Sequence, residues 1–427
     1  MCGREYLPEI IFAFVQVYSI LLHILIAEFY IPEVRKRIVI FFMSIYQHEK
    51  FKKFASDKLA MTGLFMVIFL LFMAMFAPFL ANGIPLAVLD AEKNLTFPFW
   101  RTFFAPDSSE YLIEQFFNYS VLLIFWLLTS CMIPRRFPAI RKIVRLAGAL
   151  ALLVPFFAVS RRIDKTDYRA LYAGKNDCKV FFAPIPYGPY EQCGSPCEPP
   201  SKKHILGTDD IGRSVASRLI YGARISLAVG IFATAISLVI GCFVGMFTGY
   251  FKGVTDLICM RLIEILNCFP TFLLLLILMA LLKDRKFEQS VLIIIAVLGF
   301  TSWIGLALLV RGETLRQSSF AYITSCKAMG LPLYRTFIFH LLPNISSVIF
   351  ISFTFGIAGA ILAESSLSFL GFGVQAPTAS WGGLLRQSFE DPLHYWHLTF
   401  FSGLALFIAV CGFNFMGEGL RKALSER

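Results

Sequence analysis

Long apolar segments separated by polar ones recur along the whole 427-residue chain. A helix needs roughly 20 apolar residues to cross a bilayer whose hydrocarbon core is about 30 Å thick. The sequence predicts nine spans, at residues 9–31, 59–80, 118–133, 143–160, 223–249, 260–282, 289–310, 345–365 and 397–417. The first contains His23 and Glu28, so an interfacial helix is the competing interpretation of that segment and would leave eight spans.

Basic residues predict which side of the membrane the loops occupy. Short loops rich in Lys and Arg stay in the cytoplasm. This rule places residues 32–58, the 311–344 segment and the tail at 419–427 on the cytoplasmic side. In the 311–344 segment, four cations stand against one acid, Glu313.

Two of the predicted spans form a separate unit. The segment IPRRFPAIRKIVR at 133–145, where 118–133 joins 143–160, holds five cations, which makes it cytoplasmic. Residues 118–160 are therefore predicted to be a helical hairpin that enters from outside and returns there. Loop 283–288 violates the same rule, because its Lys283, Arg285 and Lys286 fall on the outer side.

Composition agrees with a membrane protein. Hydrophobic residues make up 57% of the chain and charged residues only 16%, against about 25% in soluble domains. The net charge of +11 lies in loops between spans, which indicates cytoplasmic loops and not a nucleic-acid surface. We therefore expect a lipid bilayer, and no nucleic acid, as a partner.

Three of the ten cysteines share the polar external loop at 161–203. Cys193 and Cys197 could form a disulfide there and leave Cys178 over, or they could stay a reduced pair. Zinc would need further ligands that the neighbouring sequence does not supply. A structured surface loop is the expected role.

The external segment 204–222 carries an apolar stripe at helical spacing, formed by Ile211, Val215, Leu219 and Ile220. Thr208 or Asp209 is placed to cap the start of this amphipathic helix. The adjacent acids Asp209 and Asp210 suggest a metal. Capping together with an ion pair to Arg213 is the simpler prediction.

The cytoplasmic segment 311–344 predicts two short helices separated by a turn. Gly330 can end the first helix in the left-handed conformation, and Pro332 fits the first turn of the second. The second helix has an apolar face, and Pro343 then starts the next span. We expect a helix-turn-helix, held against the membrane, that presents a surface to a partner.

The sequence contains no complete catalytic or nucleotide-binding motif. The only Gly-Lys pair, at Gly174, is followed by Asn176, so no Gly-x-x-x-x-Gly-Lys-[Ser/Thr] loop can hold ATP phosphates. No Gly-x-Ser-x-Gly or His-Glu-x-x-His motif occurs. His394 and His397 lack a third metal ligand and suit an interfacial cluster with Tyr395 and Trp396. We expect no catalytic residue, metal site or cofactor in this chain.

Two acids lie in or beside apolar segments. A carboxylate inside a membrane costs roughly 2.5–3.5 kcal/mol on insertion scales and therefore faces a cavity or a partner. Glu364 either lines a translocation path or packs between helices, and packing is favoured because Ser365, Ser366 and Ser368 can satisfy it. Glu264 follows Arg261 by three positions, which predicts a same-face ion pair.

Several motifs together resemble one family of transporters. They read KAMG at 327–330, IFHLLPN at 338–344, HILGTDDIGRSVASRLIYGARISL at 204–227, LVRGET at 309–314 and AGAILAESSLSFLGFGVQAPTASWG at 358–382. They resemble the second, C-type permease subunit of dipeptide and oligopeptide ABC importers, and residues 50–81 resemble the first span of that subunit. The likeness covers 50–81 and about 204–427, and leaves out 1–49 and 90–200.

The resemblance implies an all-α integral membrane protein with a type I importer permease core of six helices, plus extra N-terminal and inserted helices. The expected segments are an N-terminal extension at 1–58, a first core span at 59–80, an insertion at 81–203, the external segment at 204–222, the permease domain at 223–418 and a basic tail at 419–427. The expected partners in the bacterial inner membrane are a second permease, two ATPases that bind the ATP, and an external solute-binding protein.

The resemblance also implies that the 311–344 loop couples the permease to the ATPases. It assigns this role to Thr324, Lys327, Ala328, Gly330, His340, Leu342, Pro343 and Asn344. Thr324, Ser325 and Cys326 stand where the family has Glu-Ala-Ala, so this chain lacks the glutamate of that motif.

Two other classes of function compete with this interpretation. A secondary transporter would use Glu264 or Glu364 as a proton site. A membrane-embedded enzyme would use His394 and His397. Within the transporter family, nickel or another small solute is an alternative cargo. The hairpin at 118–160 is a candidate docking element for a partner.

Overall fold

The computed structural model describes residues 48–89, 95–104, 110–131, 148, 168–172, 179–283 and 290–425. In this part of the chain five helices are long and apolar enough to cross a membrane, and the number is six if one bent pair of helices counts as one span. The protein is therefore a helical membrane protein with several crossings. The predicted span at 9–31, and all of 143–160 except Gly148, lie outside the described residues.

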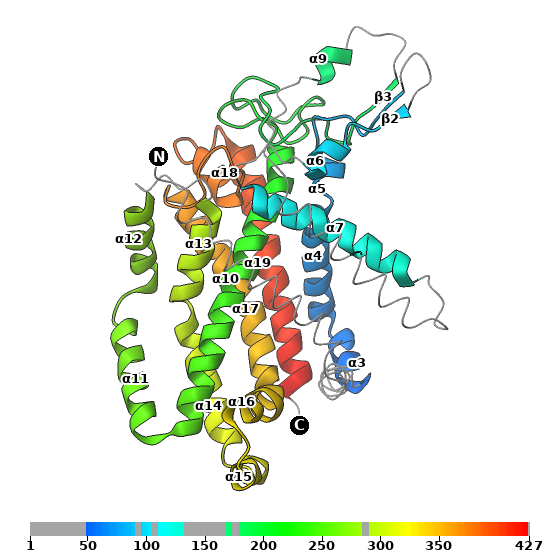
Figure 1. The fold of residues 1–427 in the computed structure, drawn as a ribbon. Coiled ribbons are helices and arrows are strands. Elements are labelled where there is room, and N and C mark those ends of the chain that lie inside the picture. The colour runs from blue at the N-terminus through cyan, green and yellow to red at the C-terminus, as the bar shows by residue number, and fades with distance from the viewer. Residues whose placement is uncertain are drawn as a thin grey trace, which may run out of the picture.

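The core helices confirm five of the predicted spans. They are α4 (Lys58–Met75), α10 (Val215–Phe251), α13 (Ser290–Thr301) continued by α14 (Trp303–Gln317), α17 (Leu342–Phe369) and α19 (Trp396–Ser425). They form one bundle in Figure 1, in which α10 runs through the middle. Helix α3 (His48–Ser56), α15 (Ala321–Ala328) and the C-terminus lie at one end of the bundle.

The bent pair corrects the predicted span at 260–282. It consists of α11 (Gly253–Asn267) and α12 (Thr271–Lys283), which meet at an angle of 74°. Pro270 lies in the break between them. A proline cannot donate a backbone hydrogen bond and its ring clashes with the preceding turn, so one straight helix cannot continue through this position.

The start of α10 corrects the predicted external segment. Ser214, and not Thr208 or Asp209, caps the helix by accepting from the Ser217 amide. Gly212 has a positive φ of 83°, which no helix contains, so the preceding residues form a loop. Residues 215–222 are consequently the first turns of α10. The span begins at Val215 and not at the predicted residue 223.

Small residues let α10 and α14 approach closely. Gly241, Gly245 and Gly249 recur every fourth position on α10. A Cβ added at Gly245 would lie 2.6 Å from the Ala307 carbonyl oxygen, and one at Gly249 would lie 2.8 Å from that of Arg311. Such a row of glycines permits the tight helix packing that is typical of membrane bundles. It makes α10 the centre of the core.

The opposite end of the bundle carries short elements that the apolar pattern did not predict. They are α5 (Ala77–Leu80), α6 (Trp100–Phe104), α9 (Tyr168–Tyr172), α18 (Trp381–Gln387) and an antiparallel sheet in the order β2 (Leu95–Thr96), β1 (Ala87–Leu89), β3 (Lys179–Phe181). The strands have two or three residues each, which is too short to show an alternating pattern.

Helix α7 (Tyr111–Cys131) covers the first half of the predicted hairpin, and starts seven residues before the predicted span at 118. It leaves the bundle at an angle (Figure 1). Its exposed half is apolar and includes Phe125 and Trp126. Gly148 lies against Trp126, since a Cβ there would come within 2.6 Å of the indole Cδ1. The hairpin stays a prediction, because the rest of 132–160 is outside the described residues.

Candidate functional site

Helix α15 lies at the end of the bundle that is predicted to face the cytoplasm, and is anchored by buried apolar side chains (Figure 1). Ile323 is fully buried and Cys326 is 3% exposed. Ile323 belongs to one cluster with residues of α10, α14 and the helical segment that runs into α17, namely Cys242, Met246, Val310, Phe337, Leu341, Ile345 and Ile349. This cluster fixes α15 to three spans at once.

Gly330 ends α15 as predicted. Its φ is 66°, in the left-handed region. The Gly330 amide donates to the Lys327 carbonyl at 3.0 Å and the Leu331 amide donates to that of Cys326 at 3.1 Å. These two bonds are the Schellman arrangement, which satisfies the last carbonyls of a helix. Pro332 takes the position just before α16 (Leu333–Arg335), one residue earlier than predicted.

The next span starts earlier than predicted. Helix α16, a π-helical segment η1 (Thr336–Leu341) and α17 form one continuous apolar helix from Leu333 to Phe369. Pro343 therefore lies inside this helix instead of starting it. The wide π turn before it accommodates a residue that cannot donate a hydrogen bond. The Asn344 side chain donates to the His340 carbonyl at 2.6 Å.

The predicted coupling residues gather on this predicted cytoplasmic surface. Thr324, Lys327, Ala328, Gly330 and Asn344 are exposed, whereas His340, Leu342 and Pro343 are half-buried.

The same surface exposes an apolar set that the motif did not identify: Phe320, Met329, Leu333, Tyr334 and Ile338, each between 41% and 67% exposed. We call these exposed residues of 320–344 the coupling surface. An apolar patch with a basic rim of this kind is typical of a protein-docking site.

The coupling surface is joined stiffly to its neighbours. The Lys327 ammonium lies 4.4 Å from the centre of the Tyr250 ring on α10. Tyr322 donates to Gln317 at 2.8 Å, and Gln317 donates to Glu313 at 2.8 Å. On α14, Arg311 makes two hydrogen bonds of 2.5 and 2.6 Å to Asp256 of α11. These contacts connect α15 with α10 and α14, and α14 in turn with α11.

Glu364 is fully buried, and its geometry favours helix packing over a translocation path. Ser368 donates to one carboxylate oxygen at 2.7 Å, while Ser226 and Ser365 donate to the other at 3.2 and 3.3 Å. Ser226 belongs to α10, so the carboxylate joins α17 to the central helix. Ser366 was wrongly predicted as a partner: it lies on another face of α17 and donates to the Leu362 carbonyl.

The predicted ion pair of the second acid, Glu264, with Arg261 is confirmed. Arg261 donates to Glu264 at 2.6 Å, and both side chains are exposed.

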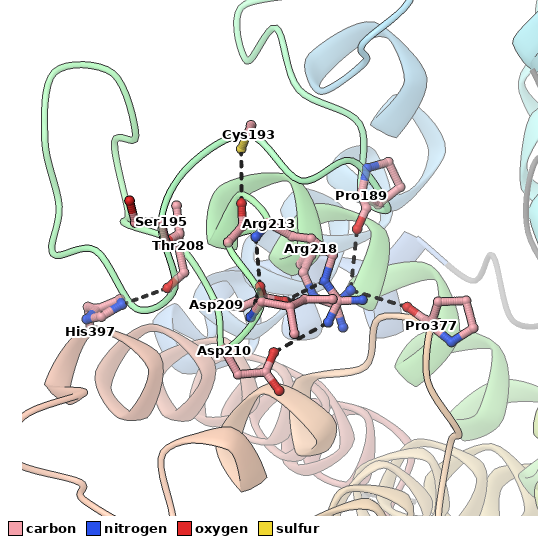
Figure 2. Close-up of polar contacts among 12 residues, drawn as sticks. Pro189, Cys193, Ser195, Thr208, Asp209, Asp210, Arg213, Arg218, Pro377 and His397 are labelled. Atoms are coloured by element: carbon pink, nitrogen blue, oxygen red, sulfur yellow. Dashed lines mark hydrogen bonds and ion pairs between the residues drawn. The ribbon is translucent and has the colours of Figure 1, made fainter. Parts of the chain in front are cut away.

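A buried ionic cluster occupies the outer end of α10 (Figure 2). Asp209 is fully buried and pairs with Arg213 at 2.7 Å, as predicted, and with Arg218 at 3.2 Å. Arg218 also donates to the Pro189 and Pro377 carbonyls at 3.3 and 3.2 Å. Burial, and then the neighbouring Asp209 charge, raise the pKa of Asp210. The sequence predicted the pair of Asp209 with Arg213 but not the contacts of Arg218, because two acceptors of Arg218 are backbone carbonyls of distant loops.

The two histidines each contact an aromatic residue of the predicted cluster, since the centre of the His394 ring lies 5.1 Å from that of Tyr395 and the centre of the His397 ring lies 6.2 Å from that of Trp396. His397 is buried and its Nε2 lies 3.0 Å from the Thr208 carbonyl oxygen (Figure 2). The exposed His394 follows Asp391, whose carboxylate accepts from the His394 amide at 3.1 Å. Among the described residues no group of three or more His, Cys, Asp and Glu side chains is placed to hold a metal ion.

Both cysteines of the external turn are free, so the disulfide alternative is not formed. The Cys193 sulfur lies 3.7 Å from the His204 Nδ1 and donates to the Gly212 carbonyl at 3.6 Å. Burial raises the pKa of the Cys193 and Cys197 thiols. Such thiols act as packing groups and not as nucleophiles. Cys178 lies outside the described residues.

Comparison with known proteins finds two matching families. Residues 218–427 match the binding-protein-dependent transport system inner membrane component, and residues 48–94 match the N-terminal TM domain of oligopeptide transport permease C. Residues 95–217 lie between the two matches.

Individual relatives agree with both matches. A dipeptide transport system permease protein of Bacillus subtilis is 40% identical over 231 residues, which cover 54% of this chain and 70% of the relative. A glutathione transport system permease protein of Pectobacterium atrosepticum is 37% identical, over 54% of this chain and 75% of the relative. An oligopeptide transport system permease protein of Bacillus subtilis is 37% identical, over 54% and 74%.

Proposed function

Because this chain belongs to the family of binding-protein-dependent inner-membrane transport components, as a peptide permease of the C type, we propose that its coupling surface docks an ATPase subunit. The observation that supports this proposal most strongly is the way α15 packs against the core. The helix is fixed to three spans on one side, while it exposes apolar and basic residues on the other. A partner bound there can move the whole core.

The proposed complex contains a second permease, two ATPases and an external solute-binding protein. No phosphate-binding loop occurs in this chain, so the ATPases supply the energy. Closure of the ATPases around ATP would displace α15 and switch the path between outward and inward access. We assign small peptides as the cargo, because relatives are named for dipeptide, oligopeptide and glutathione transport.

The experiment is an affinity purification of the tagged chain in mild detergent, with mass spectrometry of the proteins that co-purify. Gly330→Pro removes the amide that bonds Lys327 and cannot adopt the positive φ. We expect it to abolish recovery of the ATPase. Gly330→Ala should weaken recovery by about five- to tenfold, since a left-handed non-glycine residue costs roughly 1 kcal/mol. A Cβ at Gly330 meets nothing within 4 Å, so the loss would come from the backbone alone.

The matched control is Gly403→Ala on α19. A Cβ there also meets nothing within 4 Å, and φ is not positive, so recovery should equal that of the unaltered chain. A chain that purifies alone, or a Gly330→Pro variant that retains the ATPase, contradicts the proposal. Proton-driven uptake in liposomes without ATPase would favour a secondary transporter, against which the pairing of Glu264 and the burial of Glu364 both argue.

A further inference from the structure

Residues 95–217, which include most of the predicted insertion at 81–203, lie outside both family matches, yet their described parts are bonded to the matched core by buried polar groups. We call α7 and residues 183–214 together the outer brace. Buried polar groups in proteins almost always have partners. The hydrogen-bond partners of the outer brace therefore identify the core helices that it connects.

Helix α7 presents a buried polar face to the core. Glu114 and Asn118 lie one helical turn apart and Glu110 one turn before them, and each of the three is at most 7% exposed. Asn118 accepts from the fully buried Arg224 of α10 at 2.8 Å. The same guanidinium donates to the Ala74 and Met75 carbonyls at 2.7 and 3.2 Å. Arg224 thus connects α4, α7 and α10 at one point.

A second contact connects α7 with α13. The Glu110 carboxylate accepts from the Val291 amide, at the start of α13, at 3.1 Å. On the neighbouring turn, the Tyr190 hydroxyl donates to Glu114 at 2.9 Å. Since Tyr190 belongs to residues 183–214, this bond also connects the two halves of the brace.

The loop half of the brace holds further outer ends. Ile185 exchanges backbone hydrogen bonds of 3.0 and 3.1 Å with Leu80 and Asn82, just beyond α5. Arg218 connects Pro189 to the 371–380 loop through Pro377 (Figure 2). The Thr208 carbonyl meets His397 on α19.

We propose that the outer brace makes the outer ends of α4, α10, α13 and α19, with the 371–380 loop, one rigid unit. Breaking these contacts would leave a buried charge without a partner, so they resist opening. When an ATPase displaces α15, the helices held by the brace would then move together instead of shifting relative to one another. This last step rests on the proposed function, whereas the rigidity does not.

The first test locks a brace contact. Ala81 and Ile185 form a parallel bridge, and bridged strands lie about 4.8 Å apart, within the Cα separation of disulfides. Ala81→Cys with Ile185→Cys, in a chain with Cys193→Ser and Cys197→Ser, is oxidised in the purified transporter. We expect equal transport in the oxidised and reduced forms, because the contact never opens. Transport lost on oxidation and restored by reduction overturns the proposal.

The second test loosens the brace. Asn118→Leu removes the acceptor of Arg224 and also the side-chain amide that donates to the Thr102 carbonyl at 3.2 Å, whereas Asn118→Asp restores only the acceptor. The control is Ser120→Ala on the same helix, where the hydroxyl only donates to the Phe116 carbonyl. Losing one charged hydrogen bond corresponds to about tenfold faster amide exchange in residues 111–118, measured on the full-length chain in detergent. The ATP consumed per peptide imported should rise for Asn118→Leu and return for Asn118→Asp.

The outcomes separate the two proposals. Faster exchange with an unchanged ratio of transport to ATP overturns the brace as a functional device. Unchanged exchange for Asn118→Leu overturns its rigidity. A wild-type complex that neither recruits an ATPase nor transports peptide contradicts the proposed function, and the exchange experiment still decides whether the brace is rigid.

Discussion

Glu364 is a single residue whose geometry agrees with the packing role already favoured from the sequence. Its carboxylate accepts three serine hydroxyls between α10 and α17. Glu364→Leu should destabilise the chain by about 2 kcal/mol, because buried hydroxyls lose their acceptor and only partly recover by bonding backbone carbonyls. Thermal unfolding in detergent measures this loss.

Glu364→Gln is the matched variant, since it keeps an acceptor oxygen and the volume. We expect it to transport as the unaltered chain does, with and without an ionophore that collapses the proton gradient. Transport that disappears in Glu364→Gln while the fold is retained would restore the carboxylate as a proton site.

Cys193 allows a prediction on pH. Burial raises the pKa of this thiol, so at a given pH the folded chain contains less thiolate than a free cysteine. Alkylation should therefore rise at higher pH in the folded chain than after denaturation, as followed by mass spectrometry of the Cys193 peptide. The same shift contributes stability that is present below about pH 8.5 and is lost as the pH rises further. Coinciding pH profiles for folded and denatured chain would contradict the prediction.

Among the elements, α11 and α14 are joined by one ion pair near the coupling surface. Arg311 and Asp256 are 25% and 18% exposed and share two short hydrogen bonds. Asp256→Arg alone should destabilise this end by about 1–2 kcal/mol and reduce ATPase recovery, because two cations would face each other. Adding Arg311→Asp should restore most of the loss.

The exposed pair Arg261 and Glu264 is the control for this swap. It joins residues of one helix at a spacing of three, so reversing it should change stability by less than about 0.5 kcal/mol. A double variant of Asp256 and Arg311 that is no better than the single one would show that the pair does not join the helices.

Helix boundaries were predictable where the controlling residue is local. Gly330 ended α15 as expected, because the left-handed turn depends on one residue. The cap of α10 was missed, since Asp209, Thr208 and Ser214 are all good caps. The choice of Ser214 depends on Asp209 being engaged by Arg213 and Arg218. Apolar periodicity could not show that Pro270 bends a span, as both halves are equally apolar.

At the level of the whole molecule, the contacts that organise the outer end join residues far apart in the chain. Glu110 and Val291 are 181 positions apart, and Arg224 and Ala74 are 150. No sequence pattern relates such pairs, because each involves a backbone atom whose position depends on the complete fold. The family motifs located the coupling segment but gave no sign of how the insertion is attached.

The coupling surface and the outer brace lie at opposite ends of the helical bundle (Figure 1). We therefore expect them on opposite sides of the membrane. Ser325 is exposed on α15, and Ile205 is 61% exposed in the brace. Ser325→Cys should react with a membrane-impermeant maleimide only in inverted vesicles, and Ile205→Cys only in intact cells stripped of their wall. Both variants are made with Cys193→Ser and Cys197→Ser. If both sites reacted from the same side, a crossing would be wrongly assigned, and an ATPase on α15 could no longer drive a path that opens beside the brace.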